Sequence, residues 1–312
     1  MLPPSRYTRS GASLAGEPLA GLVDARKVLD LFDAGATVVL QGLHRYWPPL
    51  RDLIARLELE LGHPCQANAY LTPPGSQGFA VHSDSHDVFV FQTHGTKLWE
   101  IHGEDGAEEV LLEPGLSMYL PTGTPHAARA QDGASLHVTL GINQLTWRDL
   151  LRRSVEQTLR EVPDDHLPAG YLVHPADLSA GLTARLRSLA DAIASLDPDA
   201  AIDREVERFL TSRGALLAGG LGDLLAARDL ADDTRLRRRA GKPMVLRPDG
   251  DRIAILLGDR TLAVPGWLGP ALAHVLETTE LTPADLAPDL DEQSRLVLCR
   301  RLVREGLLEV AR

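Results

Sequence analysis

Residues 64–143 constrain the fold more strongly than any other part of the chain. Short runs rich in β-branched and aromatic residues follow one another there, and turn residues separate them at short intervals. Short strands with this spacing are typical of an antiparallel sandwich or barrel. The sequence therefore predicts a β barrel as the core of a first domain, residues 1–145, with helices at 24–35 and 48–62 ahead of its main strands.

The pattern of apolar and polar residues changes twice after residue 145. Residues 146–240 have helical periodicity, and we expect them to form a homodimer interface, because apolar helix faces between two domains must be buried somewhere. Residues 241–312 combine short strands with three helices and indicate a winged-helix-like domain. The basic run RLRRRA at 235–240 is interpreted as a solvated helix end. The predicted fold class is thus α+β.

Composition excludes several classes of protein. The chain has 312 residues, a formal net charge of −11 and two cysteines, Cys65 and Cys299, that lie far apart in sequence. These cysteines form no disulfide framework and no cysteine zinc site, which favours a reducing cytoplasm. No signal peptide and no apolar run of roughly 18 residues is recognisable, so we expect no membrane span. The acidic balance disfavours nucleic acid and favours a basic partner or substrate.

A metal-binding pattern lies inside the β block, in the run FAVHSDSHDVFVFQTHGTKLWEI. His82 and Asp84 are two residues apart, so their side chains would leave the same face of a strand. His126 follows a Pro-Thr-Gly-Thr-Pro turn that opens a later strand. Two imidazoles and one carboxylate form the facial triad of non-haem Fe(II) oxygenases, which leaves positions open for a chelating co-substrate and for O₂. An isolated His-x-Asp pair is more often an exposed strand edge, but the distal His126 favours a metal site.

Two further histidines leave alternatives open. His86 has the same parity as His82 and Asp84, but a three-histidine set would lack the carboxylate that partly neutralises a ferrous ion. A substrate-facing position and an exposed strand end are therefore equal alternatives for His86. His137 is interpreted as an interior histidine that could line the pocket.

The order His-x-Asp, DVFVFQTHGTKLWEI and YLPTGTPH resembles the JmjC-type Fe(II)- and 2-oxoglutarate-dependent oxygenases of the cupin superfamily. Within them it is most similar to the ribosomal oxygenase branch. The resemblance implies a double-stranded β-helix as the catalytic domain, a helical dimerisation region and a C-terminal winged-helix domain. It also implies that His82, Asp84 and His126 bind Fe(II), with 2-oxoglutarate and O₂ as co-substrates.

The resemblance assigns the co-substrate pocket residue by residue. Lys97 stands where the family binds the distal carboxylate of 2-oxoglutarate, on the strand after the His-x-Asp strand. Asn68 and Tyr70 match the asparagine and tyrosine of the preceding strand, and Thr139 on the last barrel strand is a weaker pocket candidate. The chain departs from the family at Val81, where a proline is common, and this leaves the shape of the loop TPPGSQGFA open.

The expected function is hydroxylation of an amino-acid side chain in a protein, and the resemblance implies an arginine or histidine of a ribosomal protein. An alternative is hydroxylation of a peptide natural product precursor. Non-enzyme alternatives are a catalytically silent cupin scaffold and a nucleic-acid adaptor that uses the C-terminal domain. Against the adaptor, residues 241–312 hold 9 lysines and arginines and 11 aspartates and glutamates, so 9 − 11 gives a net charge of −2.

Overall fold

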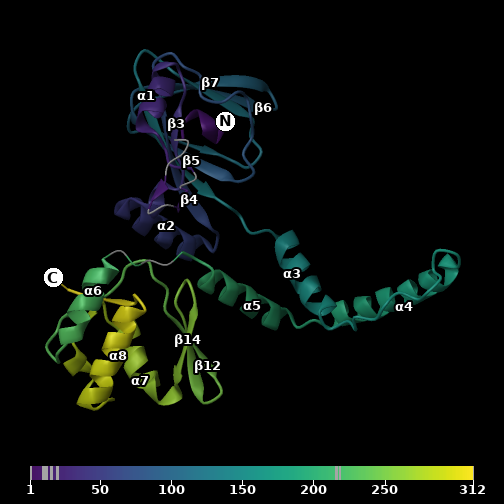
Figure 1. Cartoon of the computed structure of the whole chain (residues 1–312), viewed down its shortest axis with the longest axis vertical. Helices are drawn as coiled ribbons and strands as arrows, with labels where there is room; N and C mark the ends of the chain where they lie inside the picture. Colours follow the sequence, from purple (N-terminus) through teal and green to yellow (C-terminus); the bar gives the residue numbers. More distant parts are fainter. Residues whose placement is uncertain are drawn as a thin grey trace. The chain divides into compact units, whose positions relative to one another are not determined.

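The structure is a computed structural model that describes residues 2–311, apart from residues 9–12, 15–16, 19–20, 215–216 and 218 (Figure 1). The chain divides into two compact units, Met1–Gln144 and Leu145–Arg312. Each unit is described by itself below. In the described part of the chain, no helix combines the length and the apolar character that crossing a membrane requires.

The first unit contains two α-helices and ten strands among its described residues. They are β1 (Ser13–Leu14), β2 (Glu17–Pro18), α1 (Ala25–Asp33), β3 (Val38–Leu40), α2 (Pro48–Leu61), β4 (Cys65–Thr72), β5 (Asp87–His94), β6 (Lys97–Gly103), β7 (Gly106–Leu112), β8 (Ser117–Leu120), β9 (His126–Ala130) and β10 (Ser135–Ile142). The predicted helices are thus present: the Asp24 side chain caps α1, and α2 begins at the proline pair and ends before Gly62.

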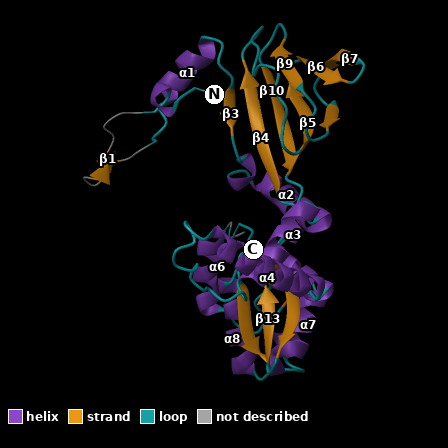
Figure 2. Ribbon diagram, turned by 90° about the vertical axis from the view of Figure 1, so that its right-hand side faces the viewer, coloured by secondary structure: helices purple, strands orange, loops and turns teal. Residues whose placement is uncertain are grey.

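Two antiparallel sheets form the core of the first unit. The larger has the order β3-β4-β10-β5-β8 and the smaller the order β7-β6-β9. Figure 2 shows β3, β4, β10 and β5 side by side. From β4 to β10 the chain passes repeatedly from one sheet to the other, as the expected barrel requires. Burial alternates along β5, where Val88 and Val90 are buried and Phe89 and Phe91 are exposed.

Apolar side chains on both faces of the larger sheet explain its position. On one face Leu50 and Ile54 of α2 pack against Cys65 and Ala67 of β4 and Leu140 of β10. On the other face side chains of β5 and β8 pack against side chains of β6 and β7, and this second cluster consists of Val88, Val90, Trp99, Leu112 and Leu120. The polar residues that share this inner face therefore lie between the two sheets.

The segment between β4 and β5 corrects the expected His-x-Asp strand. Residues 83–86 belong to no strand, and His82 forms only an isolated bridge with His126. The segment crosses from the larger sheet to the free edge of β9, where it bonds at intervals: Gly78 N–H donates to Ala128 O at 3.2 Å, and the Ser76 carbonyl accepts from Ala130 N–H. Strand parity therefore does not explain how His82 and Asp84 are oriented.

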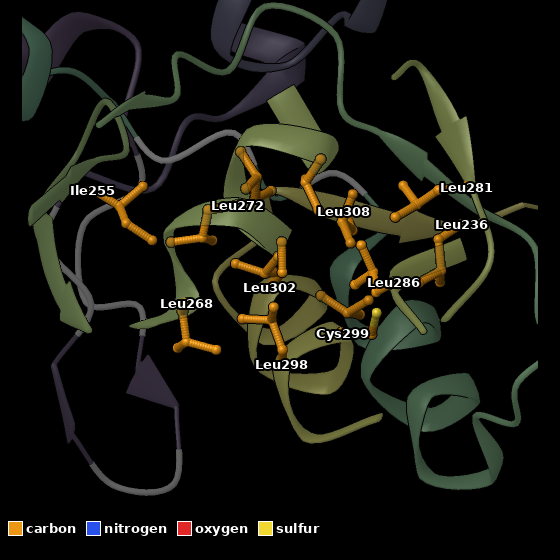
Figure 3. Close-up of a cluster of buried hydrophobic side chains, with 14 of the residues drawn as sticks. Leu236, Ile255, Leu268, Leu272, Leu281, Leu286, Leu298, Cys299, Leu302 and Leu308 are labelled. Atoms are coloured by element: carbon orange, nitrogen blue, oxygen red, sulfur yellow. The ribbon is translucent and has the colours of Figure 1, made fainter. Parts of the chain in front are cut away.

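The second unit contains helices and two further small sheets. Its described elements are α3 (Trp147–Leu159), α4 (Pro175–Ala194), α5 (Pro198–Thr211), α6 (Gly220–Ala226), β11 (Leu236–Arg238), β12 (Val245–Asp249), β13 (Arg252–Leu256), β14 (Thr261–Pro265), α7 (Gly269–Glu277), β15 (Glu280–Leu281), α8 (Glu292–Arg304) and β16 (Leu308–Val310). The sheets have the orders β12-β13-β14 and β15-β11-β16. Leucines of α7 and α8 meet those of β11 and β16 in one buried cluster (Figure 3).

The basic run at 235–240 is a strand and not the expected helix end. Leu236 is fully buried and pairs with Leu281 and Val310, so the run lies in the sheet of β15 and β16. Its arginines have partners within the unit: Arg237 pairs with Glu309 at 2.6 Å, and Arg239 pairs with Asp223 at 2.6 Å. The helical periodicity of residues 146–240 predicted the wrong structure for this run. The strands that pair with Leu236 lie after position 241, so the local pattern does not reveal them.

Candidate metal centre and co-substrate pocket

His82, Asp84 and His126 come together at one site. One ligand atom from each lies within 4.8 Å of the others, and Asp84 Oδ2 is 3.8 Å from His126 Nε2. His126 is buried, Asp84 is half-buried and His82 is exposed, so the site lies at the mouth of a pocket. The structure thus groups the three residues that the sequence picked out, and their role as ligands stays a proposal.

Both imidazoles are oriented by backbone carbonyls. His82 Nδ1–H donates to Ala80 O at 2.9 Å, and His126 Nδ1–H donates to Thr124 O at 2.9 Å. Because a carbonyl can only accept, Nδ1 carries a proton in both rings, and Nε2 is the nitrogen through which either ring can bind a metal. Burial lowers the pKa of His126 below its ordinary value of 6.5, which keeps that ring neutral.

The loop before His126 is hydrogen-bonded to Asp87, which lies at the start of β5. The Asp87 carboxylate accepts hydrogen bonds from Tyr119 OH at 2.5 Å and from the backbone N–H and hydroxyl of Thr122, both at 2.8 Å. The Tyr119 bond, helped by Thr122, lowers the pKa of Asp87 below its ordinary value. Gly123 N–H also donates to the Asp84 carbonyl at 2.9 Å. The turn is thereby fixed on both sides.

Lys97 lies in the same pocket and is 3% exposed. Its Nζ donates to Thr72 Oγ1 at 3.1 Å and lies 3.4 Å from His137 Nδ1. Burial lowers the pKa of Lys97 to about 8, and no carboxylate among the described residues forms an ion pair with it. A buried cation without a counter-ion is costly, so the pocket is electrostatically suited to an anionic ligand.

The remaining predicted pocket residues lie together, with Asn68 and Thr139 buried and Tyr70 half-buried. Asn68 and Thr139 lie close to the Tyr70 hydroxyl and act to lower its pKa, but burial has the larger effect and raises it. Asn68 Oδ1 also accepts from Gly42 N–H at 2.8 Å, so this oxygen serves the fold. Tyr70 and Thr139 line the pocket, and Asn68 supports Tyr70 from the neighbouring position on the same face of β4.

His86 does not line the pocket. Its ring lies against Gly141, where a side chain would bring Cβ to 2.7 Å from His86 Nε2. Its Nε2 is 3.4 Å from Gln66 Nε2. His86 therefore fills the space that a glycine leaves at one end of β10.

The sequence did not single out several residues that line the pocket or contact Lys97. Thr72 has the parity of Asn68 and Tyr70 on β4, and this parity could have identified it. Gly78 faces Lys97 closely enough that a Cβ built on it would lie 4.0 Å from Nζ. Apolar walls come from both sheets and consist of Val88, Val90, Trp99, Leu120 and Ala128.

The part of the chain that contains this site is similar to a known protein family. A family model described as JmjC domain matches residues 49–109 and 102–150. The chain carries a JmjC domain. The matched part includes His82, Asp84, His126 and Lys97, so the JmjC domain predicted from the sequence is confirmed for these residues. JmjC oxygenases use Fe(II) and 2-oxoglutarate, and the donor set of two imidazoles and one carboxylate suits a ferrous ion.

Curated relatives of the JmjC domain include ribosomal oxygenases. Ribosomal oxygenase 1 of Rattus norvegicus is 38% identical over 144 residues, which are 39% of this chain and 24% of the relative. A protein of Branchiostoma floridae named bifunctional lysine-specific demethylase and histidyl-hydroxylase NO66 is 33% identical over 207 residues, which are 61% of this chain and 34% of the relative. The chain thus spans about a quarter to a third of the length of these two relatives.

Solved structures extend the likeness beyond the JmjC domain. YcfD, a ribosomal oxygenase from Escherichia coli, matches with a TM-score of 0.52 and 19% identity over 88% of this chain and 78% of its own. A second structure of YcfD, in complex with cobalt and 2-oxoglutarate, matches with a TM-score of 0.50 and 19% identity over 87% of this chain and 77% of its own. At this identity the likeness concerns the fold alone.

Proposed function

We propose that this chain is an Fe(II)- and 2-oxoglutarate-dependent oxygenase that hydroxylates an amino-acid side chain of a protein. The supporting observation is the combination of His82, Asp84 and His126 at the mouth of a pocket with the buried ammonium of Lys97 in the same pocket. A metal at one end and an uncompensated cation at the other match an elongated dicarboxylate that chelates with one end.

The residues of the site have three proposed roles, which are to bind the metal, to bind the co-substrate and to exclude water. His82, Asp84 and His126 would hold Fe(II), which when bound supplies the activation of O₂ that couples 2-oxoglutarate decarboxylation to C–H hydroxylation. Lys97 would bind the distal carboxylate, with Tyr70 and Thr139 beside it. Val88, Val90 and Leu120 exclude water from this space.

Succinate formation from 2-oxoglutarate with Fe(II) and O₂ tests the proposal. We expect turnover by the wild-type protein, none by Asp84→Ala and a steep fall in Lys97→Ala. His94→Ala is the matched control, because His94 is exposed at the end of β5 and lies outside the pocket. Unchanged turnover in Asp84→Ala would exclude the metal assignment.

We further propose that the substrate is an arginine or histidine of a ribosomal protein. The ribosomal oxygenases among the relatives support this class, and the net charge of −11 suits a basic partner. Mass spectrometry of ribosomal proteins from cells with and without the gene should find one residue that carries an added oxygen atom only when the gene is present. Identical spectra would rule out this substrate class.

The second unit is proposed to supply a dimer interface and a winged-helix domain after residue 241. Its helices expose large apolar side chains, among them Leu151 on α3 at 62% and Leu182 and Leu186 on α4, each at 55%. Such a surface is usually buried by a partner, and a second copy is the partner we expect. Light scattering at micromolar concentration should give twice the mass of the chain, and a monomer would contradict the proposal. The cytoplasmic location and the lack of a nucleic-acid partner stay predictions.

A further inference from the structure

The position of the Lys97 ammonium must be set by its surroundings, because a lysine stem is flexible. An ammonium group has three N–H donors and no acceptor. Among the described residues, two side chains accept from it: Thr72 through Oγ1 at 3.1 Å and His137 through Nδ1 at 3.4 Å. Thr72 is in turn 3.1 Å from Thr37 Oγ1, which can take the Thr72 hydroxyl proton. One N–H of Lys97 therefore remains for a ligand.

The His137 ring is held on two sides. It is 3% exposed and stacks on Tyr70 with ring centroids 4.8 Å apart and planes 2° from parallel. Trp99 meets it edge-on at 5.3 Å and 77°. A ring between two aromatic partners cannot turn without displacing one of them, so the direction of Nδ1 is fixed.

The protonation state of His137 follows from its neighbours. Burial, aided by the charge of Lys97, keeps the pKa of His137 well below 6.5, so the ring is neutral at physiological pH. The ionisable groups that face it are Lys97 from β6 and Tyr70 from β4. Because the ammonium can only donate, Nδ1 must be the accepting nitrogen and the proton must sit on Nε2.

We propose that His137 is a positioning residue, whose neutral Nδ1 accepts one N–H of the Lys97 ammonium and thereby aims the free N–H at the distal carboxylate of the co-substrate. The proposal rests on the proposed function and adds to it, because it explains how a single lysine can hold a dicarboxylate in a defined place. Removal of the acceptor would free the ammonium and weaken its charged form in a buried site.

Two substitutions of His137 distinguish the effect of its hydrogen-bond acceptor from the effect of its aromatic ring. His137→Asn places a carbonyl oxygen near the position of Nδ1 but removes the ring. His137→Phe keeps the ring against Tyr70 and Trp99 but has no acceptor. Binding of 2-oxoglutarate is measured by calorimetry on protein loaded with Mn(II), without turnover. We expect His137→Phe to raise the dissociation constant about tenfold, as loss of a hydrogen bond to a charged group does, and His137→Asn to stay within about threefold of wild type.

The outcomes are distinguishable. Wild-type affinity in His137→Phe, or equal losses in both variants, would overturn the positioning role. Failure of the wild-type protein to bind 2-oxoglutarate would overturn the proposed function instead. In that case, or if the variants do not fold, nitrogen-15 NMR of the wild-type protein loaded with Zn(II) decides the role of His137. It should show His137 protonated on Nε2 alone at neutral pH, and a proton on Nδ1 would exclude the proposed acceptor.

Discussion

His82 and His126 exchange both of their backbone hydrogen bonds. His82 N–H donates to His126 O at 3.0 Å, and His126 N–H donates to His82 O at 2.8 Å. Their rings lie with centroids 4.4 Å apart. Two residues far apart in sequence are thus joined by the main chain, and each ring is oriented by its own Nδ1–H. The main chain thus holds the two imidazoles beside each other.

Removal of the metal should therefore leave the fold intact. We expect chelator-treated protein to keep the far-UV circular dichroism of the loaded protein, with a melting temperature lowered only by the loss of binding energy. Addition of Fe(II) should restore 2-oxoglutarate turnover without a refolding step. Loss of the β-sheet signal on chelation would contradict a preformed centre.

Asp87→Ala should weaken metal binding although Asp87 does not reach the metal. The substitution removes the acceptor of three hydrogen bonds from Tyr119 and Thr122, and Thr122 lies four residues before His126. By analogy with groups that orient metal ligands, we expect a loss in Mn(II) affinity of about tenfold or more by calorimetry. Tyr119→Phe removes only one of the three bonds and should have a smaller effect. Equal affinities in all three proteins would show that the turn does not depend on Asp87.

Binding of 2-oxoglutarate should weaken at alkaline pH. The pKa of Lys97 is lowered to about 8 by burial, so the free protein carries the charge below pH 8 and loses it above. Above that pH, binding has to return the proton, and the dissociation constant should rise by about tenfold per pH unit. Calorimetry on protein loaded with Mn(II) measures this, with metal affinity at each pH as the control. A flat profile from pH 7 to 10 would show that Lys97 does not bind the carboxylate as an ammonium.

Gly78→Val should block the co-substrate and spare the fold. A Cβ at this position meets Thr37 Oγ1 at 3.6 Å and Lys97 Nζ at 4.0 Å, both ordinary contact distances. The larger side chain would occupy the space in front of the ammonium. We expect a large rise in the Michaelis constant for 2-oxoglutarate with little change in melting temperature. Gly78→Ala is the control and should lie between wild type and Gly78→Val.

Asp223→Ala should destabilise the second unit. Asp223 and Arg239 form an ion pair at 2.6 Å whose side chains are 6% and 8% exposed. Removal of one partner leaves a buried charge and should lower the free energy of unfolding by about 3 kcal/mol. Glu309, 3.2 Å from Arg239, moderates the loss. The control is Asp165→Ala, because the pair of Asp165 with Arg185 is exposed and should contribute less than about 1 kcal/mol. Urea unfolding compares the two, and similar values would contradict the importance of burial.

The strands and helices of the first unit follow from local patterns in the sequence. The proline pair and Gly62 mark α2, and turn residues separate β4 to β10. Asn68 and Tyr70 are two residues apart and therefore lie on one face of β4. The strand at 236–238 was missed, because its partners are residues that come after position 241.

The sequence by itself indicated a candidate metal site, since His82, Asp84 and His126 are recognisable by type and spacing, and its resemblance to the JmjC-type oxygenases singled out Lys97. Only the tertiary structure decided that His82 and Asp84 lie on a crossing segment and that His137 faces Lys97. The physical reason is how far along the chain the interacting residues lie from one another. Parity and capping are properties of neighbours along the chain, whereas the distance between two sheets and the partner of a buried charge depend on how distant segments pack.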